Sequence, residues 1–160
     1  MALASGDKAG MFFDEKEGMP PKEREEYLNQ NIREFVRYAY DNAPTMRNRM
    51  DKTGINPSQI QRLKDLEKIP LLKRVELVQL EKEAPPFGGL LGIPLGTLER
   101  FWISPGPLYE PQDGEEEFQV EAKALYAAGL RKGGVFLNTV SHHMVPAGFR
   151  VTEGARMVGA

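Results

Sequence analysis

The stretch RFWISPGPLYEP, residues 100–111, decides how the rest of the chain is interpreted. Its apolar start, with Phe101 and Trp102, favours a β-strand, and Asp113 just beyond it suits the N-cap of a helix. Strand, loop and helix in this order form the arrangement in which α/β proteins bind phosphate, through backbone N–H groups and the positive end of the helix. The stretch therefore predicts a nucleotide-type loop over residues 104–111.

The composition of this loop departs from that of an ordinary phosphate loop. It holds one Gly, one Ser, no Thr and no Lys, and its three prolines remove three N–H donors. Glu110 places an acid where a cation would help. Two interpretations follow: Ser104, Gly106 and Tyr109 contact a nucleotide, or the segment is a structural turn stiffened by proline. For Tyr109 the alternatives are contact with a base or ring and simple packing.

Length and composition limit the classes of function. A chain of 160 residues can form a domain with its own core. The net charge of −2 gives no electrostatic case for binding nucleic acid or an anionic membrane. The absence of cysteine excludes disulfides, thiolate metal sites and cysteine nucleophiles. Because no signal peptide or apolar run of about 20 residues is visible, we expect a cytoplasmic protein with no nucleic-acid or membrane partner.

Upstream of this stretch the chain reads as helical. We expect residues 1–19 to be a loose leader and residues 20–84 to be a helical wrapping region. Prolines at the start of a helix and apolar residues at helical spacing predict three helices, over residues 21–42, 45–52 and 73–82.

Downstream, residues 85–160 read as the start of an α/β nucleotide-binding-type subdomain. The pattern predicts strands at residues 98–103 and 135–140 and helices over about 113–129 and 146–157. The second strand is a continuous apolar run, which is typical of a strand buried on both faces. The order strand–helix–strand–helix predicts a mostly parallel sheet.

Two parallel strands cannot form a stable sheet by themselves. Either the chain is a fragment of a longer protein, or a partner supplies the missing strands. The open edge also predicts that the chain associates, with a second copy among the candidates.

The only two histidines, His142 and His143, follow the second predicted strand, where α/β sheets place ligand groups. Neighbouring residues of an extended chain point apart, so joint ligation of a metal is disfavoured and no metal site is expected. A solvated pair is the plainer interpretation. The acids at 115–117 are interpreted as partners of a helix dipole.

Several motifs occur in an order that resembles a known family. They are FVRYAYDNAP at residues 35–44, DLEKIPLLK at 65–73, AGLRKGGV at 128–135, and the glycines near the C-terminus. Together, over roughly residues 20–160, they resemble the N-terminal portion of the phenylacetate–CoA ligases and the related coenzyme F390 synthetases, which are adenylate-forming enzymes. The phosphate loop of that family reads S-S-G-T-T-G-K-P, of which Ser104, Gly106 and Pro111 match.

The resemblance implies a function for the whole protein. It would activate a carboxylic acid, for which an aromatic one is a candidate, with ATP and Mg²⁺, and transfer the acyl group to CoA. Ser104, Gly106 and Tyr109 would then belong to an altered nucleotide-binding loop, and His142 and His143 would line the acyl pocket. The family's catalytic residues lie in later parts of its chain, so we assign none here. The alternative is a non-catalytic, ligase-derived binding or assembly subunit whose partner carries the rest of the fold.

Overall fold

The computed structural model describes residues 10–160, which group into two compact units. The first unit is Pro20–Asp113, and the second combines Gly114–Ala160 with residues 10–19. This boundary lies downstream of residue 85, where the sequence analysis placed its division. The assignment of a leader, a helical region and a nucleotide-type subdomain stays a prediction, and residues 1–9 of that leader lie outside the described residues.

The first unit holds the helices that periodicity predicted. They are α1 (Pro21–Asn42), α2 (Pro44–Lys52) and α3 (Arg74–Glu83), each within two residues of the predicted bounds. Proline stands in the first turn of α1 and α2, where its missing N–H is not needed. Three short 3₁₀ segments follow α2 in the chain, at Pro57–Gln59, Leu63–Lys68 and Leu95–Thr97.

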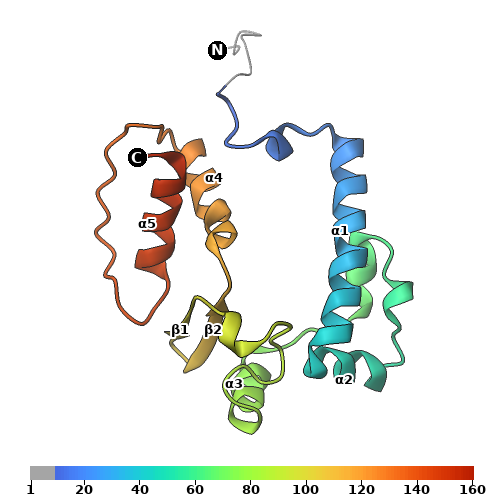
Figure 1. Ribbon diagram of the computed structural model, residues 1–160. Coiled ribbons are helices and arrows are strands. Elements are labelled where there is room, and N and C mark those ends of the chain that lie inside the picture. The colour runs from blue at the N-terminus through green and yellow to red at the C-terminus, as the bar shows by residue number, and fades with distance from the viewer. Residues whose placement is uncertain (1–9) are drawn as a thin grey trace. The chain divides into compact units, whose positions relative to one another are not determined.

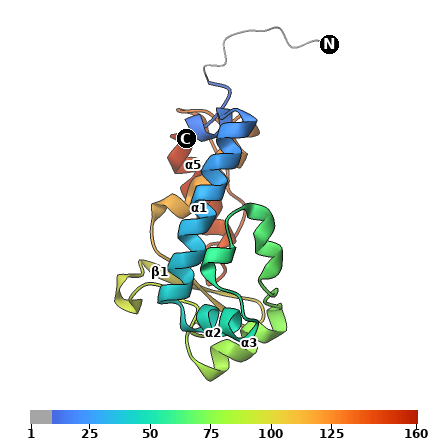
Figure 2. The same cartoon turned by 90° about the vertical axis from the view of Figure 1, so that its right-hand side faces the viewer.

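The core of this unit lies where α1, α2 and the first two of these turns meet. Val36, Met50 and Ile60 form its centre and are almost fully buried. Figure 2 shows α2 at the end of α1 and the 3₁₀ turns alongside it. The hairpin described next contacts α3.

The sheet of the described residues is an antiparallel hairpin rather than a strand followed by a loop. β1 (Arg100–Ser104) pairs with β2 (Leu108–Gln112), with Ser104 opposite Leu108 and Arg100 opposite Gln112. The predicted first strand is therefore present, but the second half of the predicted loop is wrong: it is β2. Both ends of β2 are buried and its middle is partly exposed. Packing of these ends therefore determines that residues 108–112 form a strand. The prolines in the sequence give no sign of this packing.

The second unit is built on α4 (Gln119–Ala127) and α5 (Ala147–Val158), which lie side by side in Figure 1. A 3₁₀ turn at Glu115–Phe118 precedes α4, where the sequence predicted a helix starting at Asp113. Gly154 permits the close approach, because a Cβ there would lie 2.6 Å from the Cβ of Glu121. The Arg150 guanidinium binds the Glu121 carboxylate at 2.6 Å. These contacts join the two helices into one packed layer.

The described end of the predicted leader is attached to α4. A 3₁₀ turn, Glu15–Gly18, is capped by Asp14, and the Phe13 ring meets the edge of the Tyr126 ring at 5.9 Å between centroids. Lys123 donates to the Asp14 carboxylate at 2.8 Å, which lowers the pKa of Asp14. Residues 10–18 thus contact α4 through Phe13 and Asp14.

The second predicted strand and the parallel sheet are not found in the described part of the chain. Residues 135–140 run without regular structure between α4 and α5, and the hairpin is the one sheet among residues 10–160. Val135 is 96% exposed and Leu137 is 82% exposed, so the apolar run is not buried on both faces. A strand exists only when a neighbouring strand shares its backbone hydrogen bonds, and no strand among the described residues pairs with this segment.

Candidate functional site

The predicted nucleotide-binding residues lie on the hairpin but face different surroundings. Ser104 ends β1 and is 9% exposed, and its hydroxyl has no hydrogen-bond partner among the described residues. Gly106 lies in the exposed turn between the strands. Tyr109 lies on β2, on the other face of the pleat from Ser104 and Leu108. The structure therefore presents Gly106 at the tip, buries Ser104, and directs Tyr109 toward a separate pocket.

Arg74, a cation that the sequence pattern did not reveal, lies at the turn between β1 and β2. The guanidinium of Arg74, at the start of α3, donates to the carbonyl of Pro105. A Cβ on Gly106 would lie 3.2 Å from an Arg74 nitrogen, so the glycine leaves room for this side chain. The pair Lys73-Arg74 at a helix start was the available signal, because positive charge there opposes the helix dipole. Arg74 partly replaces the positive charge that the loop's own sequence lacks.

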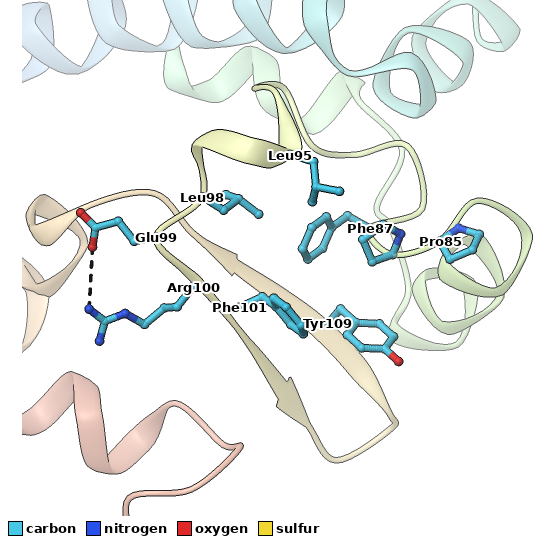
Figure 3. Close-up of a pocket in the computed structure, with 9 residues that line it drawn as sticks. Pro85, Phe87, Leu95, Leu98, Glu99, Arg100, Phe101 and Tyr109 are labelled. Carbon is cyan, nitrogen blue, oxygen red and sulfur yellow. Dashed lines mark ion pairs between the residues drawn. The ribbon is translucent and has the colours of Figure 1, made fainter.

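An apolar pocket lies on the Tyr109 side of the hairpin. Its volume is about 500 Å³, and Figure 3 shows Phe87, Leu95 and Leu98 facing the ring of Phe101, with Tyr109 beside it. The Phe101 ring centroid lies 6.5 Å from that of Phe87 and 6.1 Å from that of Tyr109. Phe101 itself is 55% exposed, so this aromatic surface is open to a ligand. Such walls suit a flat, apolar ring.

Charged groups lie at one end of the pocket. Glu99 and Arg100 line it and form an ion pair at 3.8 Å, drawn as a dashed line in Figure 3. The Arg100 guanidinium also lies 5.8 Å from the centroid of the Trp102 ring. Trp102 is 6% exposed, so it is a core residue rather than a surface on which a ligand ring could stack. The pocket is thus apolar in its walls and carries a partly exposed ion pair at its rim.

A buried acid holds the strand that carries Tyr109. Glu81 of α3 is 5% exposed, and its carboxylate accepts the backbone N–H of Tyr109 at 2.9 Å. Glu81 and Glu110 both line a second cavity of about 280 Å³ behind β2. Glu110, the acid expected to repel phosphate, therefore lines this cavity, whereas Arg74 contacts the turn. The charge at the tip of the hairpin is more favourable to an anion than the sequence indicated.

The two histidines contact the second unit's own residues. The His142 ring lies 2.9 Å from the Thr152 hydroxyl and edge-on to the Phe149 ring, at 4.9 Å between centroids. His143 accepts the backbone N–H of Val145 through Nδ1 at 3.2 Å. Both are exposed, and their place in an acyl pocket stays a prediction.

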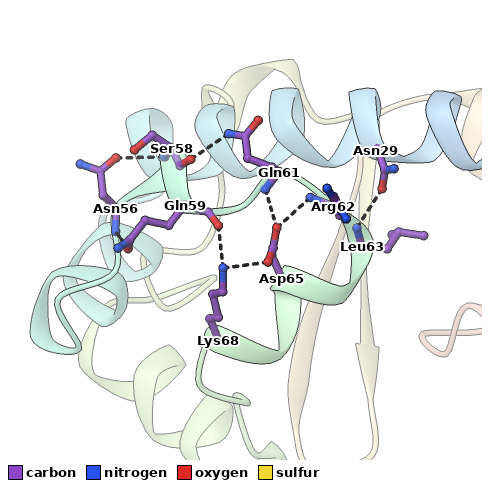
Figure 4. A network of polar contacts seen from close by, with 9 residues as sticks. All are labelled: Asn29, Asn56, Ser58, Gln59, Gln61, Arg62, Leu63, Asp65 and Lys68. Atoms are coloured by element: carbon purple, nitrogen blue, oxygen red, sulfur yellow. Dashed lines mark hydrogen bonds and ion pairs between the residues drawn. The ribbon is translucent and has the colours of Figure 1, made fainter.

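The motif at residues 65–73 has a structural role in this chain. Figure 4 shows Asp65 accepting the backbone N–H groups of Gln61 and Arg62, at 2.9 and 3.0 Å, and pairing with Lys68 at 2.7 Å. Chiefly the hydrogen bond from Lys68 lowers the pKa of Asp65 to about 2. Asn29 of α1 accepts the first N–H of the turn at 3.1 Å. Asp65 of the motif thus holds the start of the 3₁₀ turn, and Asn29 joins this turn to α1.

Within residues 10–160, no group of three or more acidic, histidine or cysteine side chains is placed to hold a metal ion. Among the same residues, no helix combines the length and the apolar character that crossing a membrane requires.

Comparison with known proteins confirms the predicted resemblance. No family model matches the chain. A phenylacetate-coenzyme A ligase of Thermus thermophilus is 27% identical over 156 residues, which cover 93% of this chain and 34% of that protein. The phenylacetate-coenzyme A ligase of Aromatoleum evansii is 26% identical over 137 residues, covering 81% of this chain and 30% of that protein. The chain thus spans about a third of the length of these relatives.

Solved structures agree on the fold. A 2-hydroxyisobutyryl-CoA ligase in complex with 2-HIB-AMP matches with a TM-score of 0.81 and 23% identity, over 88% of this chain and 31% of that one. The same enzyme in complex with 2-HIB-AMP and CoA matches with a TM-score of 0.79 and 21% identity, again over 88% and 31%. The mixture of helices and a small antiparallel hairpin therefore matches part of an adenylate-forming ligase fold.

Proposed function

We propose that this chain, which is similar over most of its length to phenylacetate-coenzyme A ligases, forms part of an adenylate-forming acyl-CoA ligase. The whole enzyme would activate a carboxylic acid, an aromatic one being a candidate, with ATP and Mg²⁺ and pass the acyl group to CoA. The observation that carries the proposal is the match over 93% of the chain to a ligase about three times as long. The chain alone is expected not to turn over.

Within this function, we assign the tip of the hairpin to the nucleotide phosphates. Arg74 supplies positive charge there and Gly106 leaves the backbone accessible. The Ser104 hydroxyl is buried beside this exposed tip, so it contributes only if the strand end moves. Tyr109 would contact the base or another ring through the apolar pocket that it lines. The described residues offer no cluster of acids for Mg²⁺, so the metal would be held chiefly by phosphates and by the rest of the enzyme.

The alternative is a ligase-derived binding or assembly subunit without ATP chemistry. Two observations favour it: the three prolines of the 104–111 segment remove N–H donors, and the Ser104 hydroxyl is buried. In that case the chain would contribute its fold to a partner that carries the remaining sheet. Either function requires further protein around this one.

Calorimetric titration with ATP distinguishes the two functions. The ligase interpretation predicts weak binding to the chain, in the millimolar range, that Arg74→Ala weakens roughly tenfold, as the loss of one charged contact does. Lys73→Ala is the matched control, since it removes the same charge one residue earlier, and it should leave the affinity nearly unchanged. No heat at millimolar ATP would reject nucleotide binding by the hairpin and support the assembly subunit.

A further inference from the structure

The cavity behind β2, called here the acid cavity, combines apolar walls with two carboxylates. Its volume is about 280 Å³. Its walls include Leu77, Phe87 and Leu90, and its two acids are Glu81 and Glu110. Within residues 10–160, no lysine, arginine or histidine lines it. Apolar walls with a few convergent polar groups are the usual form of a small-molecule site, and this volume suits a ligand smaller than a drug.

Glu81 is a buried acid that has no cationic partner among the described residues. It is 5% exposed, and its Oε2 atom accepts the Tyr109 N–H at 2.9 Å. Within residues 10–160, its other carboxylate oxygen accepts no hydrogen bond and the carboxylate forms no ion pair. Glu81 also lies in the last turn of α3, where the negative end of the helix dipole opposes an acid. Because buried charges in proteins are nearly always paired, this carboxylate is suited to a cation.

Glu110 and the edge of β2 add further acceptors. Glu110 is partly exposed, and its carboxylate makes no hydrogen bond or ion pair within the described part of the chain. The Tyr109 N–H points away from β1 toward Glu81, so the Tyr109 carbonyl lies on the same edge of the strand. The acid cavity therefore presents two carboxylates and a carbonyl, and none of the residues that line it supplies a compensating positive charge.

We propose that the acid cavity binds a small primary ammonium ion with a branched hydrocarbon body. An ammonium group has three N–H donors and no acceptor, which matches Glu81, Glu110 and the Tyr109 carbonyl. The hydrocarbon body would lie against the apolar walls and be removed from water. Two negative charges disfavour an anion, and a neutral molecule would leave both of them unpaired. This inference goes beyond the acyl-CoA ligase function and does not depend on it.

An NMR titration of the chain with 3-methylbutylammonium chloride tests this site. The Tyr109 amide is the reporter, since its N–H donates to Glu81. We expect a saturable shift of this amide with a dissociation constant in the roughly millimolar range, as the small size of the probe allows. 3-Methylbutanol has the same hydrocarbon body without the charge, and should bind at least about tenfold more weakly at matched ionic strength. This comparison requires no variant of the protein.

One variant and its matched control locate the ammonium ion. Glu110→Gln keeps the size of the side chain but removes its charge, and should weaken binding roughly tenfold. Glu99→Gln removes the same charge at the rim of the apolar pocket of Figure 3, and should change the affinity less than about twofold. Neither residue is buried, so both variants should retain the dispersed amide spectrum of the folded chain.

The other outcomes would overturn the proposal. Equal affinity for the amine and the alcohol would show that only the apolar walls bind. Binding that is lost in Glu99→Gln but kept in Glu110→Gln would place the ammonium ion at the apolar pocket instead. Equal losses in both variants would indicate a response to net charge, and the absence of a saturable shift at Tyr109 would show that the cavity does not bind the ion.

Discussion

Replacing Glu81 by leucine tests how β2 and Tyr109 are held in the first unit. Glu81 is 5% exposed, and its carboxylate accepts the Tyr109 N–H at 2.9 Å. A hydrogen bond to a charged group contributes about 1.5–3 kcal/mol, and leucine offers no acceptor to replace it. We therefore expect Glu81→Leu to lower the free energy of unfolding by about 2 kcal/mol. Glu81→Gln keeps an acceptor of the same size without the charge, and should lose about half as much.

The single tryptophan gives a direct assay. Trp102 lies on β1, is 6% exposed, and should report urea unfolding of this hairpin by its fluorescence. The opposing effect is the desolvation of a buried carboxylate, which can exceed the gain from its interactions. A Glu81→Leu variant as stable as the original chain would show that desolvation dominates and would refute the reasoning. Equal losses for leucine and glutamine would show that the acceptor is not what stabilises β2.

Two further perturbations address the packing and the pH dependence. Gly154→Ala should destabilise the second unit by about 1–2 kcal/mol. The free energy lost by overpacking against α4 should exceed the free energy gained from the higher helix propensity of alanine. Circular dichroism during urea unfolding measures this, and a gain in stability would mean that α4 and α5 are not in close contact. Because Asp65 has its pKa lowered from 3.8 to about 2, its stabilising effect is complete well above pH 3.8 and disappears as the pH falls through 2. Asp65→Asn should flatten the stability profile in this range, and an NMR titration of Asp65 with a midpoint near 3.8 would contradict it.

The helices were predictable because local signals determine them. Proline at the first position and apolar residues at helical spacing place α1 and α2, and the structure keeps both within two residues of expectation. The hairpin was only half predictable. Pro105, Pro107 and Pro111 favour a loop, and the partnership that makes residues 108–112 a strand depends on burial of Leu108 and Gln112.

The site was less predictable than the fold, since its groups come from distant parts of the chain. Arg74 reaches the turn across 31 positions of sequence, and Glu81 reaches β2 across 28. Neither position stands out in a pattern of local periodicity. For residues 135–140 the apolar run predicts a buried strand, whereas Val135 and Leu137 are exposed and no strand among the described residues pairs with the run.

Amide hydrogen exchange at residues 135–139 tests most directly whether this chain carries an unfinished sheet. In the isolated chain these amides should exchange nearly as fast as in an unstructured peptide, because none of them donates a hydrogen bond within residues 10–160. On addition of the part of the Thermus thermophilus ligase that lies outside the matched stretch, these amides should become strongly protected from exchange. Strong protection in the isolated monomer, before any partner is added, would contradict the account.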